Sequence, residues 1–177
     1  MSASRPLLFL DVDGTLIPFG TPPPATHQTR APARPDDAHP LLHRVEPEHG
    51  RLLSALPCEL VWATTWMSAA NDVLAPLLRL PALPVVDWPD SDEDDALHWK
   101  TRGLVEWAQG RPFVWVDDEI GPADHAWVAA HHHGPALLHR VDPRRGLTAD
   151  DFTTIRSWLE QVRWSDEARR AGSRQRP

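Results

Sequence analysis

The sequence predicts an α/β protein, a three-layer α/β/α domain of Rossmann-like type built on a central parallel sheet of about five strands. Short apolar runs of about five to seven residues alternate along the chain with segments whose apolar residues recur three or four positions apart. Strand and helix in regular alternation require crossover connections, which make the strands parallel and place helices on both faces of the sheet.

The apolar runs define the expected strands, and the segments between them define the expected helices. The strands are predicted at 6–11, 58–64, 83–88, 111–117 and 136–142. Helices are predicted at 47–56, 68–80, 98–110 and 122–133, and a last one starts after Thr148. Pro76 is expected to kink or divide its helix. Thr148 and Asp151 have the spacing of a capping box at the start of the last helix.

A chain of 177 residues has the length of one domain, which we expect to span 1–164. Residues 22–40 are too rich in proline for a regular element and predict a long surface loop. The segment 165–177 is predicted to be a polar, disordered tail. The connections on either side of 58–64 are too short to hold a large folded cap domain, so the sheet edge above the strands is expected to be open.

Composition limits the function classes. No apolar run reaches the roughly 20 residues that span a bilayer, and the early run 6–10 is too short for a signal peptide, so a cytoplasmic protein without membrane contact is expected. The single Cys58 excludes an internal disulfide and a cysteine-based zinc site. A net charge of −7 disfavours a broad nucleic-acid-binding face, although nucleic acid stays an alternative partner.

Acidic residues follow two of the predicted strands. Asp11 and Asp13 end the run "LLFLDVD", and Asp117 and Asp118 end "FVWVDD". Ligands of open parallel sheets bind beyond the carboxyl ends of the strands, so these carboxylates should meet if their strands are neighbours. Grouped carboxylates repel one another unless a hard cation lies between them, and oxygen ligands with room for water and phosphate favour Mg²⁺.

The one-residue spacing of the first two aspartates suggests two separate tasks. Gly14 and Thr15 allow a sharp reversal of the chain after the strand, which leaves both side chains above the sheet. Asp11 is then expected to be the nucleophile and a metal ligand. Asp13 is expected to reach the leaving group as general acid and afterwards to activate water.

Four motifs in order resemble those of the haloacid dehalogenase-like (HAD) phosphohydrolases, of the small capless type. "FLDVDGTL" is similar to the first motif, and "LVWATTW" to the second, a strand ending in Ser or Thr. "HWKTRG" supplies the lysine of the third, and "FVWVDDE" resembles the acidic fourth. With their strands, these motifs cover nearly the whole chain except the proline-rich loop and the tail.

The resemblance implies a role for each matching residue. Asp11 would be phosphorylated in a covalent intermediate. Thr64, or Thr65 as the alternative, would bind the phosphoryl oxygens, and Lys100 would neutralise their charge. The Mg²⁺ site would consist of carboxylates from the first and fourth motifs and one backbone carbonyl, that of Asp13: Asp11, Asp13, Asp117 and Asp118.

The function expected from the resemblance is a Mg²⁺-dependent phosphomonoester hydrolase that acts through an aspartyl-phosphate intermediate on a phosphorylated small molecule or macromolecule. One alternative is a nucleotide or nucleic-acid-end phosphatase, and another is a non-catalytic partner-binding protein that keeps the fold. Trp66, Trp88 and Trp99 flank the second and third motifs, and either pack in the core or stack on a substrate at the mouth of the site. The sequence does not indicate the oligomeric state.

Overall fold

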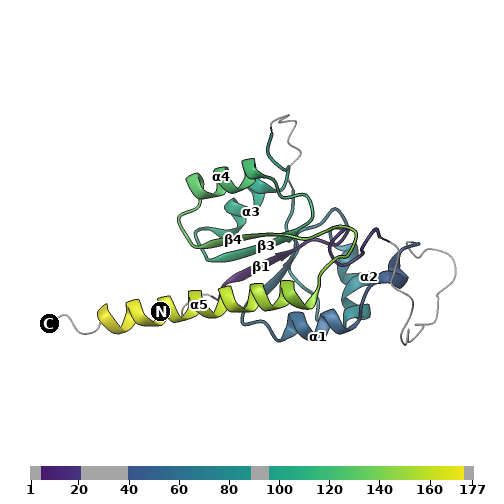
Figure 1. Cartoon of the computed structure of the whole chain (residues 1–177), viewed down its shortest axis with the longest axis horizontal. Coiled ribbons are helices and arrows are strands. Elements are labelled where there is room, and N and C mark those ends of the chain that lie inside the picture. The colour runs from purple at the N-terminus through teal and green to yellow at the C-terminus, as the bar shows by residue number, and fades with distance from the viewer. Residues whose placement is uncertain (1–4, 21–39, 89–95, 174–177) are drawn as a thin grey trace.

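The structure, a computed structural model, describes residues 5–20, 40–88 and 96–173, with only the backbone described for 166–173. Figure 1 shows a sheet between two layers of helices. The four strands of the sheet are all parallel and lie in the order β2-β1-β3-β4. Their bounds are β1 Leu7–Leu10, β2 Glu59–Trp62, β3 Phe113–Asp117 and β4 Ala136–Arg140. The α/β fold with a parallel sheet is confirmed.

Helices cover both faces of this sheet (Figure 1). One layer holds α1 Glu48–Ser54, α2 Ala69–Leu78 and α5 Ala149–Ser173, and the other holds α3 Thr101–Ala108 and α4 Pro122–His131. A short 3₁₀ helix, η1, spans Leu42–Arg44. Successive side chains of β1 point to opposite faces, so Leu8 and Leu10 pack in one core cluster, whereas Leu7 and Phe9 pack in the other. This double burial explains why the strand is apolar throughout.

The strand register brings the acidic residues to one edge. Leu10 of β1 pairs with Trp62 of β2 on one side and with Val116 of β3 on the other. The backbone N–H of Asp11 donates to the Val116 carbonyl at 3.1 Å, so Asp11 lies beside Asp117. The carboxyl ends of β1, β2 and β3 therefore meet at the centre of the sheet, as the sequence predicts.

The predicted strand 83–88 forms only an isolated bridge in the structure. Val85 bridges Trp62 in parallel, through hydrogen bonds from Trp62 N to the Pro84 carbonyl and from Val86 N to the Trp62 carbonyl. The segment lies beside β2, where an edge strand would lie, and Val86 is buried. Pro81 and Pro84 lack the backbone N–H groups that a longer ladder would need, so the apolar run packs as extended chain.

Two helices differ from the expectation. Pro76 lies in the last turn of α2, and the helix continues past it to Leu78, so Pro76 does not divide the helix. Helix α5 continues to Ser173, so the backbone is helical over much of the segment predicted to be a disordered tail. Its start is as predicted, since Asp151 Oδ2 accepts hydrogen bonds from the Thr148 N–H at 2.7 Å and the Thr148 hydroxyl at 2.6 Å.

The connections around β2 are short in the described part of the chain. Between β1 and β2 they contain η1 and α1, and between β2 and α3 they contain α2. The expected loop 22–40 lies outside the described residues except for Pro40. Within the described ranges, every helix is either too short or too polar to cross a bilayer.

Candidate active site

Lys100 is the centre of the site. Its Nζ donates to Asp11 Oδ1 at 2.6 Å and to Asp117 Oδ2 at 2.7 Å. The ammonium group comes from the residue before α3, whereas the two carboxylates come from the ends of β1 and β3. All three side chains are buried. An ion pair this deep is stabilised only while all its members are present, because removing one leaves an uncompensated buried charge.

Asp118 brings a third carboxylate to the same point. Oxygens of Asp11, Asp117 and Asp118 all lie within 4.8 Å of one another. A Cβ on Gly14 would lie 2.4 Å from Asp118 Oδ2, and Gly14 has a φ of +75°. Only glycine therefore allows the loop after β1 to pass so close to the Asp118 carboxylate.

This donor set fits a hard divalent cation. Three carboxylates against one ammonium leave an excess of negative charge, and all the candidate ligands are oxygen atoms, which Mg²⁺ prefers. Burial, followed by the nearby Asp117 charge, raises the pKa of Asp11 to about 7, although Lys100 opposes the shift. Burial and Asp117 also raise the pKa of Asp118. A bound cation would favour the ionised form of both groups.

Burial alone would lower the pKa of Lys100, but the charges of Asp11 and Asp117 outweigh it and raise the pKa. The ammonium form is therefore the one held in the site at neutral pH. It gives the site a fixed positive charge beside the predicted nucleophile.

Asp13 lies beside this cluster, and its carboxylate is held by Trp66. The Trp66 indole N–H donates to Asp13 Oδ2 at 2.8 Å. The backbone N–H of the same tryptophan donates to the Thr64 hydroxyl oxygen at 3.3 Å. Thr64 is buried after the end of β2, whereas Thr65 is exposed. The Thr64 oxygen is the acceptor in this bond, so the hydroxyl hydrogen takes no part in it.

Two buried residues that the sequence analysis did not assign to the site, Thr15 and Asp124, hold it in place. The hydroxyl of Thr15 donates to Asp11 Oδ2 at 3.5 Å. Asp124, near the start of α4, accepts from the His98 N–H at 2.9 Å, the Thr101 hydroxyl at 2.5 Å and the Gly121 N–H at 2.8 Å. Asp124 thus fixes the first turn of α3, from which Lys100 reaches the aspartates.

Aromatic rings border the lysine. The Lys100 Nζ lies 5.3 Å from the ring centroid of Trp99, and Trp99 is 45% exposed. Trp88 packs edge-on against Trp99, with ring centroids 4.8 Å apart, and donates its indole N–H to the Thr64 carbonyl at 3.4 Å. Trp66 and Trp88 are thus tied to the second motif by hydrogen bonds, and Trp99 is the ring that presents surface to solvent.

The family described as "HAD domain in Swiss Army Knife RNA repair proteins" matches residues 7–152, which is most of the chain. The chain belongs to this family. The matched region of the HAD domain runs from the first residue of β1 into α5 and includes every residue of the cluster described above. No curated protein and no solved structure gives a significant match.

The structure of this HAD domain brings four of the predicted residues into one cluster, Asp11, Lys100, Asp117 and Asp118. Asp13 and Thr64 lie beside it and are joined to each other through Trp66. The sequence shows Asp124 only as an acidic residue at the third position of the predicted helix 122–133, where an acid commonly caps the helix, and gives no indication of its contact with α3. Its contact with α3 depends on tertiary packing, which a single sequence does not give.

Proposed function

We propose that this protein is a Mg²⁺-dependent phosphomonoesterase in which Asp11 becomes transiently phosphorylated. The observation that carries the proposal is the pair of hydrogen bonds from Lys100 to Asp11 and Asp117, with Asp118 at the same point. A buried carboxylate beside a fixed ammonium group, at the open edge of a sheet, suits attack on a phosphoryl group whose charge must be neutralised. Membership of the HAD family supports this reaction class.

In the first step, an Asp11 carboxylate oxygen attacks phosphorus while the bond to the leaving-group oxygen breaks. Asp13 gives its proton to that oxygen, so the alcohol leaves neutral. In the second step, Asp13 takes a proton from water, and the water oxygen attacks phosphorus. The acyl-phosphate bond breaks, which releases phosphate and restores the Asp11 carboxylate.

Other residues of the chain hold the charge and geometry during both steps. Lys100 stays next to Asp11 and balances the charge of the phosphoryl oxygens, and the Thr64 hydroxyl donates to one of them. Asp11, Asp117 and Asp118, with the Asp13 carbonyl, would hold Mg²⁺. When bound, the ion supplies further positive charge to the phosphoryl group and orients it.

The substrate class that we favour is the phosphorylated end of a polynucleotide. Two observations support it over a small metabolite. The matched family is described as a domain of RNA repair proteins. In addition, the described connections around β2 hold only the short helices η1, α1 and α2, so in this part of the chain the site is not enclosed by a folded cap. The overall charge of −7 weighs against nucleic acid, so any contact with a strand must be local.

The experiment is a phosphate-release screen with and without Mg²⁺. Its substrates are p-nitrophenyl phosphate, phosphorylated metabolites, nucleotides, and oligonucleotides phosphorylated at the 3′ or the 5′ end. The proposal predicts turnover that EDTA abolishes and that is faster with an oligonucleotide than with the mononucleotide. Mg²⁺ binding without turnover of any phosphoester would instead support a non-catalytic binding protein.

A further inference from the structure

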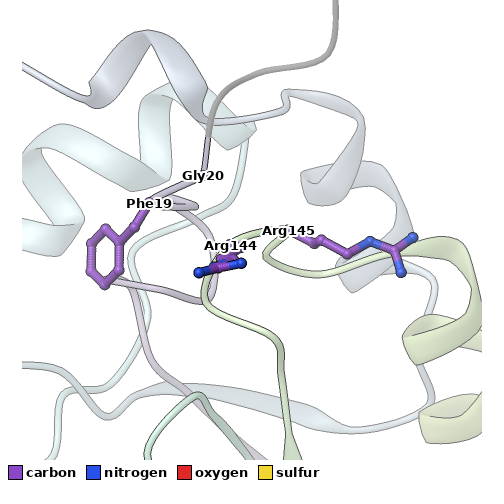
Figure 2. Close-up of a pocket in the computed structure, with 4 residues that line it drawn as sticks. All are labelled: Phe19, Gly20, Arg144 and Arg145. Atoms are coloured by element: carbon purple, nitrogen blue, oxygen red, sulfur yellow. The ribbon is translucent and has the colours of Figure 1, made fainter.

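A groove lies beside the loop that carries the two aspartates. It has a volume of about 560 Å³ and is lined by Phe19, Gly20, Arg144 and Arg145. Phe19 is 52% exposed, and both arginines are exposed as well. Figure 2 shows the groove where the chain after β1 meets the loop between β4 and α5.

The groove is joined to the candidate active site through the backbone. The Phe19 N–H donates to the Pro143 carbonyl at 2.7 Å, and the Leu147 N–H donates to the Thr15 carbonyl at 2.9 Å. Thr15 also contacts the Asp11 carboxylate through its hydroxyl. Phe19 is the fourth residue after Thr15, and four residues of extended chain span at most about 14 Å. The groove therefore lies within reach of a ligand whose end is bound at Asp11.

The backbone that carries the aromatic wall of the groove is held in a fixed position. Arg44 Nη1 donates to the Pro18 carbonyl and to the Gly20 carbonyl, both at 2.9 Å, so the backbone on each side of Phe19 is fixed. Gly146, with a φ of +66°, lets the opposite loop approach, because a Cβ there would lie 2.8 Å from the Thr15 carbonyl oxygen. An exposed phenylalanine on a fixed backbone is suited to stacking on a nucleobase.

The two arginines indicate an extended ligand. In Figure 2 the Arg144 side chain extends toward the side of Phe19, whereas Arg145 extends away from it. One small anion would be bound best by guanidinium groups that converge on it. Guanidinium groups that diverge along a groove suit successive negative charges on one strand, and a ring at one end of that row suits a base that such a strand carries.

The geometry points to a binding site for single-stranded polynucleotide in the Phe19–Arg144–Arg145 groove. It would bind the nucleotides next to the end that is processed at Asp11, with phosphates on the arginines and a base on Phe19. This inference rests on the proposed action on polynucleotide ends. It adds a site outside the catalytic cluster that selects strands over mononucleotides.

The test compares Arg144→Gln/Arg145→Gln with the matched control Arg51→Gln/Arg156→Gln. The control removes the same charge from exposed or partly exposed arginines that do not line the groove. For hydrolysis of a phosphorylated oligonucleotide, we expect the groove variant to lose about tenfold or more in kcat/KM. Hydrolysis of p-nitrophenyl phosphate should stay at the wild-type rate, and the control should match the wild type with both substrates. If the groove variant kept the wild-type kcat/KM for the oligonucleotide, the proposal that this groove binds polynucleotide would be wrong.

A binding measurement separates failure of the site from failure of the proposed reaction. Anisotropy of labelled oligonucleotides with hydroxyl ends, one RNA and one DNA, is followed against salt. Loss of two phosphate contacts should reduce the slope of log K against log salt by about 1.4. Phe19→Leu should weaken binding about tenfold with the slope unchanged. If the wild type hydrolyses no phosphoester but these binding effects appear, the proposed reaction is wrong and the proposed polynucleotide-binding site is supported. The proposed site would be contradicted if the wild type did not bind the oligonucleotides, or if the wild type and the arginine variant had equal slopes of log K against log salt.

Discussion

The indole N–H of Trp66 donates a hydrogen bond to Asp13 Oδ2 at 2.8 Å, and the backbone N–H of Trp66 donates to the Thr64 hydroxyl oxygen. One residue therefore positions both the proposed acid/base and the proposed phosphoryl-binding hydroxyl. The sequence left two interpretations open for Trp66, packing in the core or stacking on a substrate at the mouth of the site. In the structure it is partly buried and acts on the site through its hydrogen bonds.

Trp66→Phe should keep the ring packing and remove the hydrogen bond to Asp13. Without this hydrogen bond the Asp13 carboxyl group loses its fixed position, and misplacement of a catalytic group by about 1 Å can cost about 10²-fold, so kcat should fall about 10- to 100-fold with little change in KM. Steady-state kinetics with p-nitrophenyl phosphate measure the effect. In the Asp13→Asn background, the same substitution should cost little more, because its partner is already altered. Full additivity of the two losses would show that Trp66 does not act through Asp13.

Asp13→Asn should keep the nucleophile and the carboxylates of the metal site but remove proton transfer. Turnover should fall by a factor of about 10²–10⁴. Mg²⁺ binding, measured by calorimetry, should be close to that of the wild type. With an activated leaving group that needs no proton, a burst of one product per enzyme is expected, because the water that resolves the intermediate lacks its base. Wild-type turnover in this variant would remove Asp13 from the mechanism.

The raised pKa of Asp11 predicts a pH-dependent stability of the metal-free protein. Because the folded-state pKa of Asp11, about 7, lies above the ordinary aspartate value of 3.8, the folded state binds more protons than the unfolded state between these pH values. The contribution is fully present below about pH 4 and is lost as the pH rises to about 7. The shift in the pKa of Asp11 corresponds to a change of at most ~4 kcal/mol in the free energy of unfolding between these two pH values.

Denaturant unfolding in EDTA, measured from pH 4 to 8 for the wild type and Asp11→Asn, checks this prediction. The free energy of unfolding of the wild type should fall with pH relative to that of the variant, which lacks the titrating group. Added Mg²⁺ should stabilise the wild type more at pH 8 than at pH 5. Parallel pH curves for the two proteins would contradict the assigned direction.

Asp124→Asn should act at a distance from the substrate. An amide cannot accept on both of its polar atoms, so one of the donors His98 N–H, Thr101 Oγ1 and Gly121 N–H must lose its partner. We expect a loss of about 1–3 kcal/mol in unfolding free energy and a lower kcat, since the first turn of α3 positions Lys100. Thermal unfolding and kinetics are the measurements, and Asp150→Asn, an exposed acid at the start of α5, is the control. An unaltered kcat would show that the α3 start does not depend on Asp124.

Much of the fold could be predicted, because β1 and β3 are buried on both faces and read as continuous apolar runs that end in aspartates. Neighbouring parallel strands then bring those aspartates together. The short pairing at 83–88 could not be predicted. Val85 and Val86 are typical of a strand, but Pro81 and Pro84 limit the pairing to one bridge. The role of Asp124 depends on the docking of α3 against α4, and the length of α5 exceeds what its polar sequence indicates.

The central claim is that Asp11 itself carries the phosphoryl group, and chemical trapping tests it most directly. Borohydride reduces an aspartyl phosphate to homoserine, which peptide mass spectrometry locates in the chain. During turnover of a phosphomonoester with Mg²⁺, we predict homoserine at position 11 in the wild type, a larger fraction in Asp13→Asn, and none in Asp11→Asn. Continued turnover with no homoserine at position 11 in any of these proteins would contradict the account.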